Sequence, residues 1–60
     1  PDLITHGQLV VDAKVIDRIT DLEIGQMLNY LKITGFSVGI ILNFRRSKLE
    51  WQRIVLEMNR

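Results

Sequence analysis

An acidic and a basic residue stand two positions apart in an apolar run, and their types and spacing suit them to chemistry. Residues 9–16 are typical of a strand, in which residues i and i+2 point to the same face, so Asp12 and Lys14 stand side by side. A second carboxylate, Asp2, lies ten residues upstream, and residues 6–8 are typical of a turn that folds the chain back. The sequence therefore predicts two carboxylates and an ammonium group in one neighbourhood, a set that can hold a hard divalent cation and stabilise negative charge.

The same residues allow a second interpretation, in which they do no chemistry. Asp12 and Lys14 then form an ordinary salt bridge on a strand, and Asp2 is a terminal residue. Moving a charge out of water is costly unless it is paired, so such a pair can persist for structural reasons after an activity is lost. The spacing alone leaves both interpretations open.

Two strands and a helix must position these residues. Residues 2–5 predict a short first strand, and residues 9–16 predict a second strand that is apolar on both faces, a pattern normally covered on both sides. A capping box of Thr20 and Glu23 predicts the start of a helix, and Gly35 predicts its left-handed end. Within the helix Gly25 costs about 1 kcal/mol relative to alanine, which predicts a close approach to the sheet.

The second half of the chain predicts two more strands joined by a basic loop. Residues 36–44 predict a third strand that is again apolar on both faces, residues 45–48 a hairpin loop, and residues 49–58 a fourth strand. The fold class is therefore α/β (α+β), with a mixed four-stranded sheet, one helix and the element order β-β-α-β-β. Because one helix covers one sheet face, we expect a second copy of the chain to cover the other.

Length and composition limit how this fold can be stabilised. Sixty residues make one domain, and a monomer of this size buries only about 60% of its unfolded surface. There is no cysteine for disulfides or a thiolate metal site, so we expect a homo-oligomer. The formal net charge of +1 neither demands nor excludes a polyanionic partner. Apolar stretches are too short to span a bilayer and no signal peptide is recognisable, so we expect a cytoplasmic protein with no membrane contact.

The spacing of Asp2, Asp12 and Lys14 resembles the metal-site signature of the PD-(D/E)xK nuclease superfamily. Along nearly all its length the chain resembles the C-terminal part of a branch of that superfamily, the small bacterial proteins named for a GxxExxY motif. The matching segments read VVDAK, QMLNYLKITG, VGIILNF and QRIV. Two features depart from the branch: Asp12 stands where Glu is usual, and the N-terminal helix that carries GxxExxY is absent. The resemblance therefore implies one truncated nuclease-like domain, residues 1–60, as half of a restriction-endonuclease-like fold. The apolar second face of the sheet predicts that self-association completes it.

This resemblance implies nuclease chemistry. The expected reaction is Mg2+-dependent hydrolysis of phosphodiester bonds in DNA, by an endo- or exonuclease. Magnesium accepts one or two carboxylates and keeps several waters, so the expected ligands are Asp2 and Asp12, with the Ala13 carbonyl as a third and Mn2+ as an alternative ion. Lys14 is expected to orient the attacking water or to stabilise developing negative charge. No small-molecule cofactor is expected.

Gln26 and Tyr30 also resemble a family element, the Q-x-x-x-Y pair that RecB-like nucleases carry on the helix after the catalytic strand. The resemblance implies that both residues face the active site. The alternative is that Tyr30 is a half-buried core aromatic and Gln26 a solvated polar residue. His6 is interpreted as a turn residue, because there is no second histidine with which it could share a metal.

Basic residues of the predicted hairpin are candidates for contacts with nucleic acid. Arg45, Arg46 and Lys48, with Arg53 on the next strand, can contact phosphates, but a solvated hairpin tip that protects a sheet edge gives the same pattern. Three functions follow from the sequence. The first is the inherited nuclease; the alternatives are a non-catalytic homo-oligomer and a nucleic-acid-binding module that uses the 45–48 loop.

Overall fold

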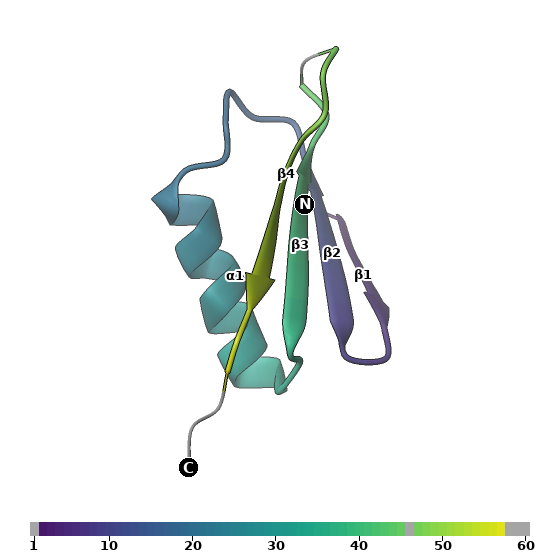
Figure 1. Ribbon diagram of the computed structural model, residues 1–60, viewed down its shortest axis with the longest axis vertical. Coiled ribbons are helices and arrows are strands. Elements are labelled where there is room, and N and C mark those ends of the chain that lie inside the picture. Colours follow the sequence, from purple (N-terminus) through teal and green to yellow (C-terminus); the bar gives the residue numbers. More distant parts are fainter. Residues whose placement is uncertain (1, 46, 58–60) are drawn as a thin grey trace.

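The described residues, 2–45 and 47–57, of the computed structural model form four strands and one helix (Figure 1). Along the chain they are β1 (Asp2–His6), β2 (Leu9–Lys14), α1 (Asp21–Thr34), β3 (Val38–Asn43) and β4 (Glu50–Val55). The sheet order is β1-β2-β3-β4, with β2 and β3 parallel and both outer pairs antiparallel. The predicted α+β class, element order and mixed sheet are therefore confirmed, and they are consistent with half of a restriction-endonuclease-like fold.

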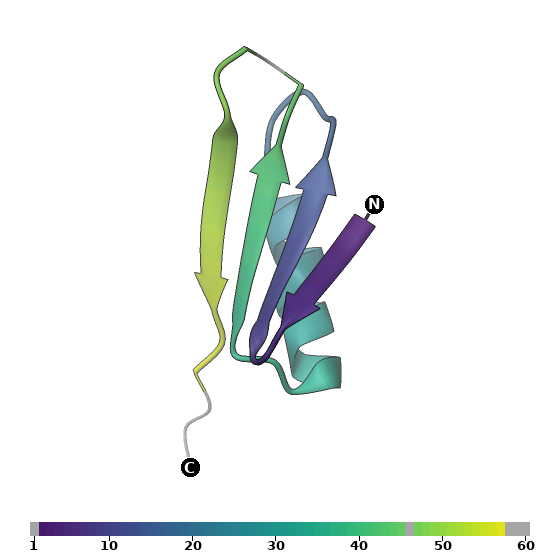
Figure 2. The same cartoon turned by 90° about the vertical axis from the view of Figure 1, so that its right-hand side faces the viewer.

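A sheet and a helix packed on one of its faces make up the two layers of the described structure (Figure 2). α1 provides the crossover that two parallel strands need, because it connects β2 to β3. The core between the layers draws on three of the strands and on the helix. Its buried apolar residues in the described part of the chain are Val10, Met27, Leu31, Ile41 and Ile54.

The other side of the sheet, which we call the open face, is also apolar. Val10 and Ile41 are buried beneath the helix, so their neighbours along β2 and β3 point to the opposite side. The strand register aligns these neighbours across the sheet, and Ile4 and Trp51 on the outer strands are 65% and 59% exposed. By the register, the described residues of the open face are His6, Ile4, Leu9, Val11, Ala13, Val38, Ile40, Leu42, Trp51, Arg53 and Val55. Strands that are apolar on both faces are therefore confirmed, whereas the second copy that would cover them stays a prediction.

α1 begins and ends as the sequence predicts. The Thr20 hydroxyl and the Thr20 N–H both donate to Oε1 of Glu23, at 2.6 and 2.7 Å. These two bonds hold the pKa of Glu23 below its usual value, and the bond from the hydroxyl has the larger effect. At the other end Gly35 adopts a left-handed φ of 82° and its N–H donates to the carbonyl of Leu31. No helix among the described residues is long and apolar enough to cross a membrane.

The observed strands in the second half are shorter than predicted: β3 is Val38–Asn43 and not 36–44, and β4 is Glu50–Val55 and not 49–58. Two boundaries in the first half are wrong for identifiable reasons. β2 ends at Lys14 and not at Ile16, because the backbone of Ile16 leaves the ladder and bonds to the side chain of Asn43. His6 is the last residue of β1, paired with Leu9, and not a turn residue. The turn consists of the two residues between them, and Gly7 supplies the positive φ of 60° that such a hairpin needs at its first central position.

The prediction that Gly25 marks the close approach of helix and sheet is also wrong. Gly25 is exposed, and a Cβ added there would meet no described atom within 4 Å beyond its own helix backbone and chain neighbours. The close approach is at Gly39 on β3, where an added Cβ would stand 2.7 Å from Cγ of Met27 and closer still to its Sδ. Met27 therefore packs where a side chain on β3 would otherwise lie.

Alanine substitutions at these two glycines should change stability in opposite directions. Gly25→Ala is expected to raise the free energy of unfolding by about 0.5–1 kcal/mol, because alanine loses less backbone entropy in a helix. Gly39→Ala is expected to lower it by about 1–3 kcal/mol, because Met27 must move within a packed core. Urea unfolding followed by circular dichroism measures both changes. Midpoints that shift in the same direction would contradict the placement of α1 on β3.

Candidate metal centre

The predicted acidic and basic pair is formed in the structure. Asp12 and Lys14 both lie on the face of β2 that α1 covers, and Nζ of Lys14 is 3.1 Å from Oδ2 of Asp12. Their side chains are only 11% and 14% exposed. Desolvating a carboxylate and an ammonium is costly, and each offsets part of the cost for the other. The salt bridge of the non-catalytic interpretation is therefore present, and Asp12 and Lys14 share one face of β2 as the spacing predicts.

The second carboxylate oxygen of Asp12 has no such compensation. Oδ1 is buried and has no hydrogen-bond partner among the described residues. A buried acceptor left unpaired costs about 1–3 kcal/mol, and more when it is charged. A hard anionic oxygen is the donor that Mg2+ and similar cations prefer. Oδ1 of Asp12 is thus an oxygen of the type that a divalent cation takes, and metal ligation by Asp12 stays a prediction.

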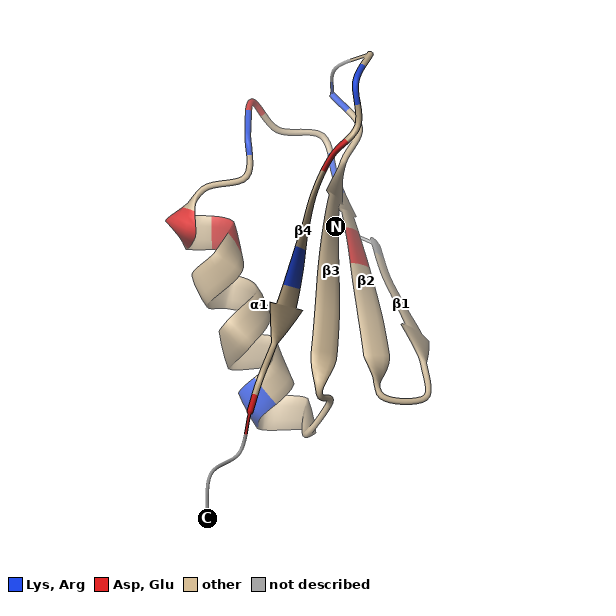
Figure 3. Cartoon of the chain, in the orientation of Figure 1, with Lys and Arg blue, Asp and Glu red and all other residues tan. Residues whose placement is uncertain are grey.

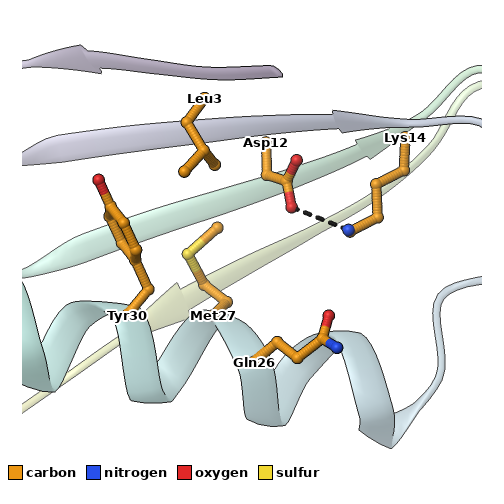
Figure 4. Close-up of a pocket in the computed structure, with 6 residues that line it drawn as sticks. All are labelled: Leu3, Asp12, Lys14, Gln26, Met27 and Tyr30. Atoms are coloured by element: carbon orange, nitrogen blue, oxygen red, sulfur yellow. Dashed lines mark ion pairs between the residues drawn. The ribbon is translucent and has the colours of Figure 1, made fainter. Parts of the chain in front are cut away.

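A pocket of about 170 Å3 lies at this carboxylate, between α1 and the β1–β2 hairpin (Figure 4). One water molecule takes about 30 Å3 of liquid volume, so the pocket has room for several. Apolar and polar side chains share its wall. The lining residues are Leu3, Asp12, Lys14, Gln26, Met27 and Tyr30.

Gln26 and Tyr30 line this pocket from α1, one helical turn apart (Figure 4). The amide of Gln26 extends from the helix toward the Lys14 side, whereas the ring of Tyr30 rises on the other side with its hydroxyl toward β1. Tyr30 is half-buried and packs edge to face on Phe36, with ring centroids 6.4 Å apart. Tyr30 is thus a core aromatic and a wall of the pocket at once, and Gln26 is exposed at its rim.

The register of the β1–β2 hairpin places Asp2 opposite Ala13 and Leu3 opposite Asp12. Directly opposed residues share a sheet face, so Leu3 is the β1 residue that lies beside Asp12 in the pocket. The side chain of Asp2 lies outside the described part of the structure. Metal ligation by Asp2 and by the Ala13 carbonyl therefore stays a prediction. Among the side chains that are described, no three of His, Asp and Glu gather as a metal-binding group.

Sequence reasoning missed two lining residues, Leu3 and Met27. Leu3 could have been found from the turn, because a two-residue loop at residues 7–8 pairs position 3 with position 12. Met27 carries no such local signal. It enters the pocket because Gly39, twelve residues later, leaves it space on the sheet.

The basic candidates for nucleic-acid contact that the structure describes belong to two parts of the chain, the β3–β4 loop and β4 (Figure 3). Arg45 and Lys48 are exposed in the β3–β4 loop, where Nη1 of Arg45 is 2.9 Å from Oδ1 of Asp17. Arg53 stands opposite Ile40 on the open face, away from the pocket side of the sheet. Arg46 lies outside the described residues. A role of these side chains in nucleic-acid contact stays a prediction.

A family model described as the PD-(D/E)XK nuclease superfamily matches residues 1–54. That range includes every residue that lines the pocket and the whole of β1, β2, α1 and β3. Searches of curated proteins and of solved structures returned no match. Because the match spans most of the sequence, the chain belongs to the PD-(D/E)XK nuclease superfamily.

Proposed function

We propose that this chain is a divalent-metal-dependent module that hydrolyses phosphodiester bonds in DNA, of the branch named for the GxxExxY motif. The observation that carries the proposal is the buried, unpartnered Oδ1 of Asp12 beside the ammonium of Lys14. Membership of a nuclease superfamily supports the reaction class. The likeness of the segments VVDAK and QMLNYLKITG supports the branch.

Asp12 is the residue that would hold the cation, through Oδ1. By resemblance, Asp2 and the Ala13 carbonyl would complete the protein ligands. Nucleases of this superfamily are generally dependent on divalent metal ions, and an all-oxygen ligand set favours Mg2+. When bound, the cation supplies positive charge to the phosphate and makes a water molecule more acidic.

The side chains around Asp12 can each assist hydrolysis. Lys14 fixes the carboxylate through Oδ2, and its ammonium stands where negative charge develops on the phosphate oxygens. Gln26, at the rim, can hydrogen-bond a water or a phosphate oxygen. Leu3 and Met27 keep part of the pocket apolar, and this strengthens the electrostatic interactions between the charges inside it. In the reaction the water oxygen bonds to phosphorus, the bond to a bridging oxygen breaks, and that oxygen takes up a proton.

Self-association through the open face is the second part of the proposal. The chain exposes 4684 Å2, whereas a folded protein of 7.0 kDa exposes about 4,000 Å2 by the usual scaling with mass. An excess of this kind fits a sheet with one uncovered apolar face, which is the surface that a second copy would bury. A second copy presenting the same face is self-complementary, because both faces are apolar sheets.

Cation binding to an Asp12 variant tests the metal centre. Asp12→Asn keeps the size of the side chain and removes its charge, and it is expected to weaken Mn2+ or Mg2+ binding at least tenfold and to abolish cleavage of DNA. Isothermal titration calorimetry measures the binding. The matched control is Asp17→Asn, which removes an exposed carboxylate paired with Arg45 and is expected to leave the affinity unchanged.

The outcomes separate the candidate functions. Equal affinity of Asp12→Asn and the unaltered chain would place the cation elsewhere and overturn the proposal. An oligomer that binds no cation would support the non-catalytic alternative. Salt-dependent DNA binding that survives the loss of Asp12 but not of Arg45 and Arg46 would favour a nucleic-acid-binding module.

A further inference from the structure

We propose that Asn43 and Glu50 are positioning residues, which clamp the β2–α1 connection and so hold α1 over the pocket of Asp12. Only the expected effect of these residues on cation binding rests on the proposed function. The clamp itself consists of hydrogen bonds within the fold, and none of them involves a cation. Both residues lie on the side of the sheet that α1 covers, at the end where β2 and β3 finish.

Asn43 is buried, with 2% of its surface exposed, and every hydrogen-bonding group of its amide is used. Its Oδ1 accepts from the N–H of Ile16 at 3.0 Å and from the N–H of Arg45 at 3.3 Å. Its Nδ2 donates to the carbonyl of Ile16 at 2.8 Å and to Oε1 of Glu50 at 2.9 Å. The side chain thus binds the backbone of Ile16 as a neighbouring strand would, two residues after Lys14.

Glu50 extends the clamp to the start of the helix. Both of its carboxylate oxygens lie 3.1 Å from the N–H of Ile19, which precedes the helix cap Thr20. A negative charge at this position also interacts favourably with the positive end of the helix dipole. Glu50 stands directly opposite Asn43 on β4, so the two side chains act on successive parts of one connection.

The connection that they hold is residues 15–20, which lie between the regular elements and join β2 to α1. β2 supplies Asp12 and Lys14 to the pocket, and α1 supplies Gln26, Met27 and Tyr30. The register strengthens the link, because Lys14, Asn43 and Glu50 stand in one row across the sheet. A functional site must be held to within about 0.5 Å, and supporting hydrogen bonds usually provide that precision.

Neither residue was singled out by its sequence context, and neither touches the pocket. The two side chains bind the backbone of the connection and each other. If the clamp only tied down a loop, its loss would loosen residues 15–20 and leave α1 in place. If it positions the helix, its loss would also change the contacts of α1 with the sheet.

Asn43→Asp separates these cases, because it keeps the shape of the side chain. It removes both N–H donors and sets a second carboxylate against Glu50. We expect amide hydrogen exchange at Ile19 to accelerate at least tenfold, because the new carboxylate repels Glu50, and the NMR contact between the Met27 methyl and Gly39 to weaken. The N–H of Ile16 keeps a carboxylate oxygen as its acceptor and so does not report on the change. Mn2+ affinity of the folded variant is expected to fall roughly tenfold, because α1 carries one wall of the pocket.

Two further variants control the experiment. Asn29→Asp makes the same substitution at an exposed position on α1 and is expected to change none of these measurements. Asn43→Asp combined with Glu50→Gln restores the hydrogen bond with its direction reversed and the total charge unchanged. This pair is expected to recover protection at Ile19 and the Met27 contact. Where Asn43→Asp alone does not fold, Glu50→Ala alone is measured, because it removes the acceptor of both Ile19 and Asn43, and it is expected to show the same changes.

The NMR contacts decide the inference. An unchanged Met27 contact beside a loosened connection would overturn the positioning role and leave a loop tether. Loss of both that is reversed in the paired variant would support it. Failure of the unaltered chain to bind Mn2+ would count against the proposed function alone, since the position of α1 is read without the ion.

Discussion

Leu31→Ala is expected to leave the chain largely unfolded at 25 °C. Leu31 is fully buried in α1, and replacing such a residue with alanine typically costs about 2–5 kcal/mol. A domain of this size rarely has more than about 3–5 kcal/mol of stability from its core. The described core holds five buried apolar residues, so the neighbours have little capacity to fill the space.

Far-UV circular dichroism with urea titration measures this loss. The matched control is Ile33→Ala on the same helix, where the residue is 75% exposed and the change in unfolding free energy should stay within about 0.5 kcal/mol. Equal unfolding midpoints for the two variants would contradict the packing of α1 on the sheet.

We expect the chain to form a dimer with twice the monomer mass of 7.0 kDa. Introducing charges on the open face should abolish this dimer, which is the second large effect that we predict. Ile4→Lys combined with Trp51→Lys places two charges on the exposed outer strands of that face. Buried unpaired charges are strongly unfavourable, and tryptophan is frequent among the residues that dominate interface energy. The expected result is a folded protein with the mass of the monomer.

Light scattering across a range of concentrations measures the mass. Ile33→Lys serves as the control, because it charges an equally exposed apolar residue on α1, outside the open face. Asp12→Asn should leave the mass unchanged, since Asp12 lies on the other side of the sheet. A stable monomer formed by the unaltered chain would overturn self-association through the open face.

The parts of the fold that depend on neighbours in sequence could be predicted from the sequence. Thr20 and Glu23 satisfy each other within one turn, so the start of α1 is set locally. The placement of Asp12 and Lys14 on one face follows from the two-residue period of a strand. The start of α1 and the shared face of Asp12 and Lys14 are therefore set by residues close in sequence, independently of the rest of the chain.

The parts that depend on distant contacts could not be predicted in this way. β2 ends early because the side chain of Asn43, twenty-seven residues later in the chain, hydrogen-bonds the backbone of Ile16. Gly25 on α1 and Gly39 on β3 are both positions where a helix and a sheet can approach closely, and only the position of Met27 shows that the approach is at Gly39. The unpartnered oxygen of Asp12 is likewise a property of the packed pocket.

The two-residue turn between β1 and β2 has a consequence for insertions and deletions in this chain. With the turn as it stands, Leu3 is opposite Asp12. A slip of one residue in this hairpin would exchange the two faces of β1, and would set either Asp2 or Ile4 opposite Asp12 instead. Loop length at Gly7 therefore decides whether an acidic or an apolar residue of β1 borders the carboxylate, without any substitution among the residues that line the pocket.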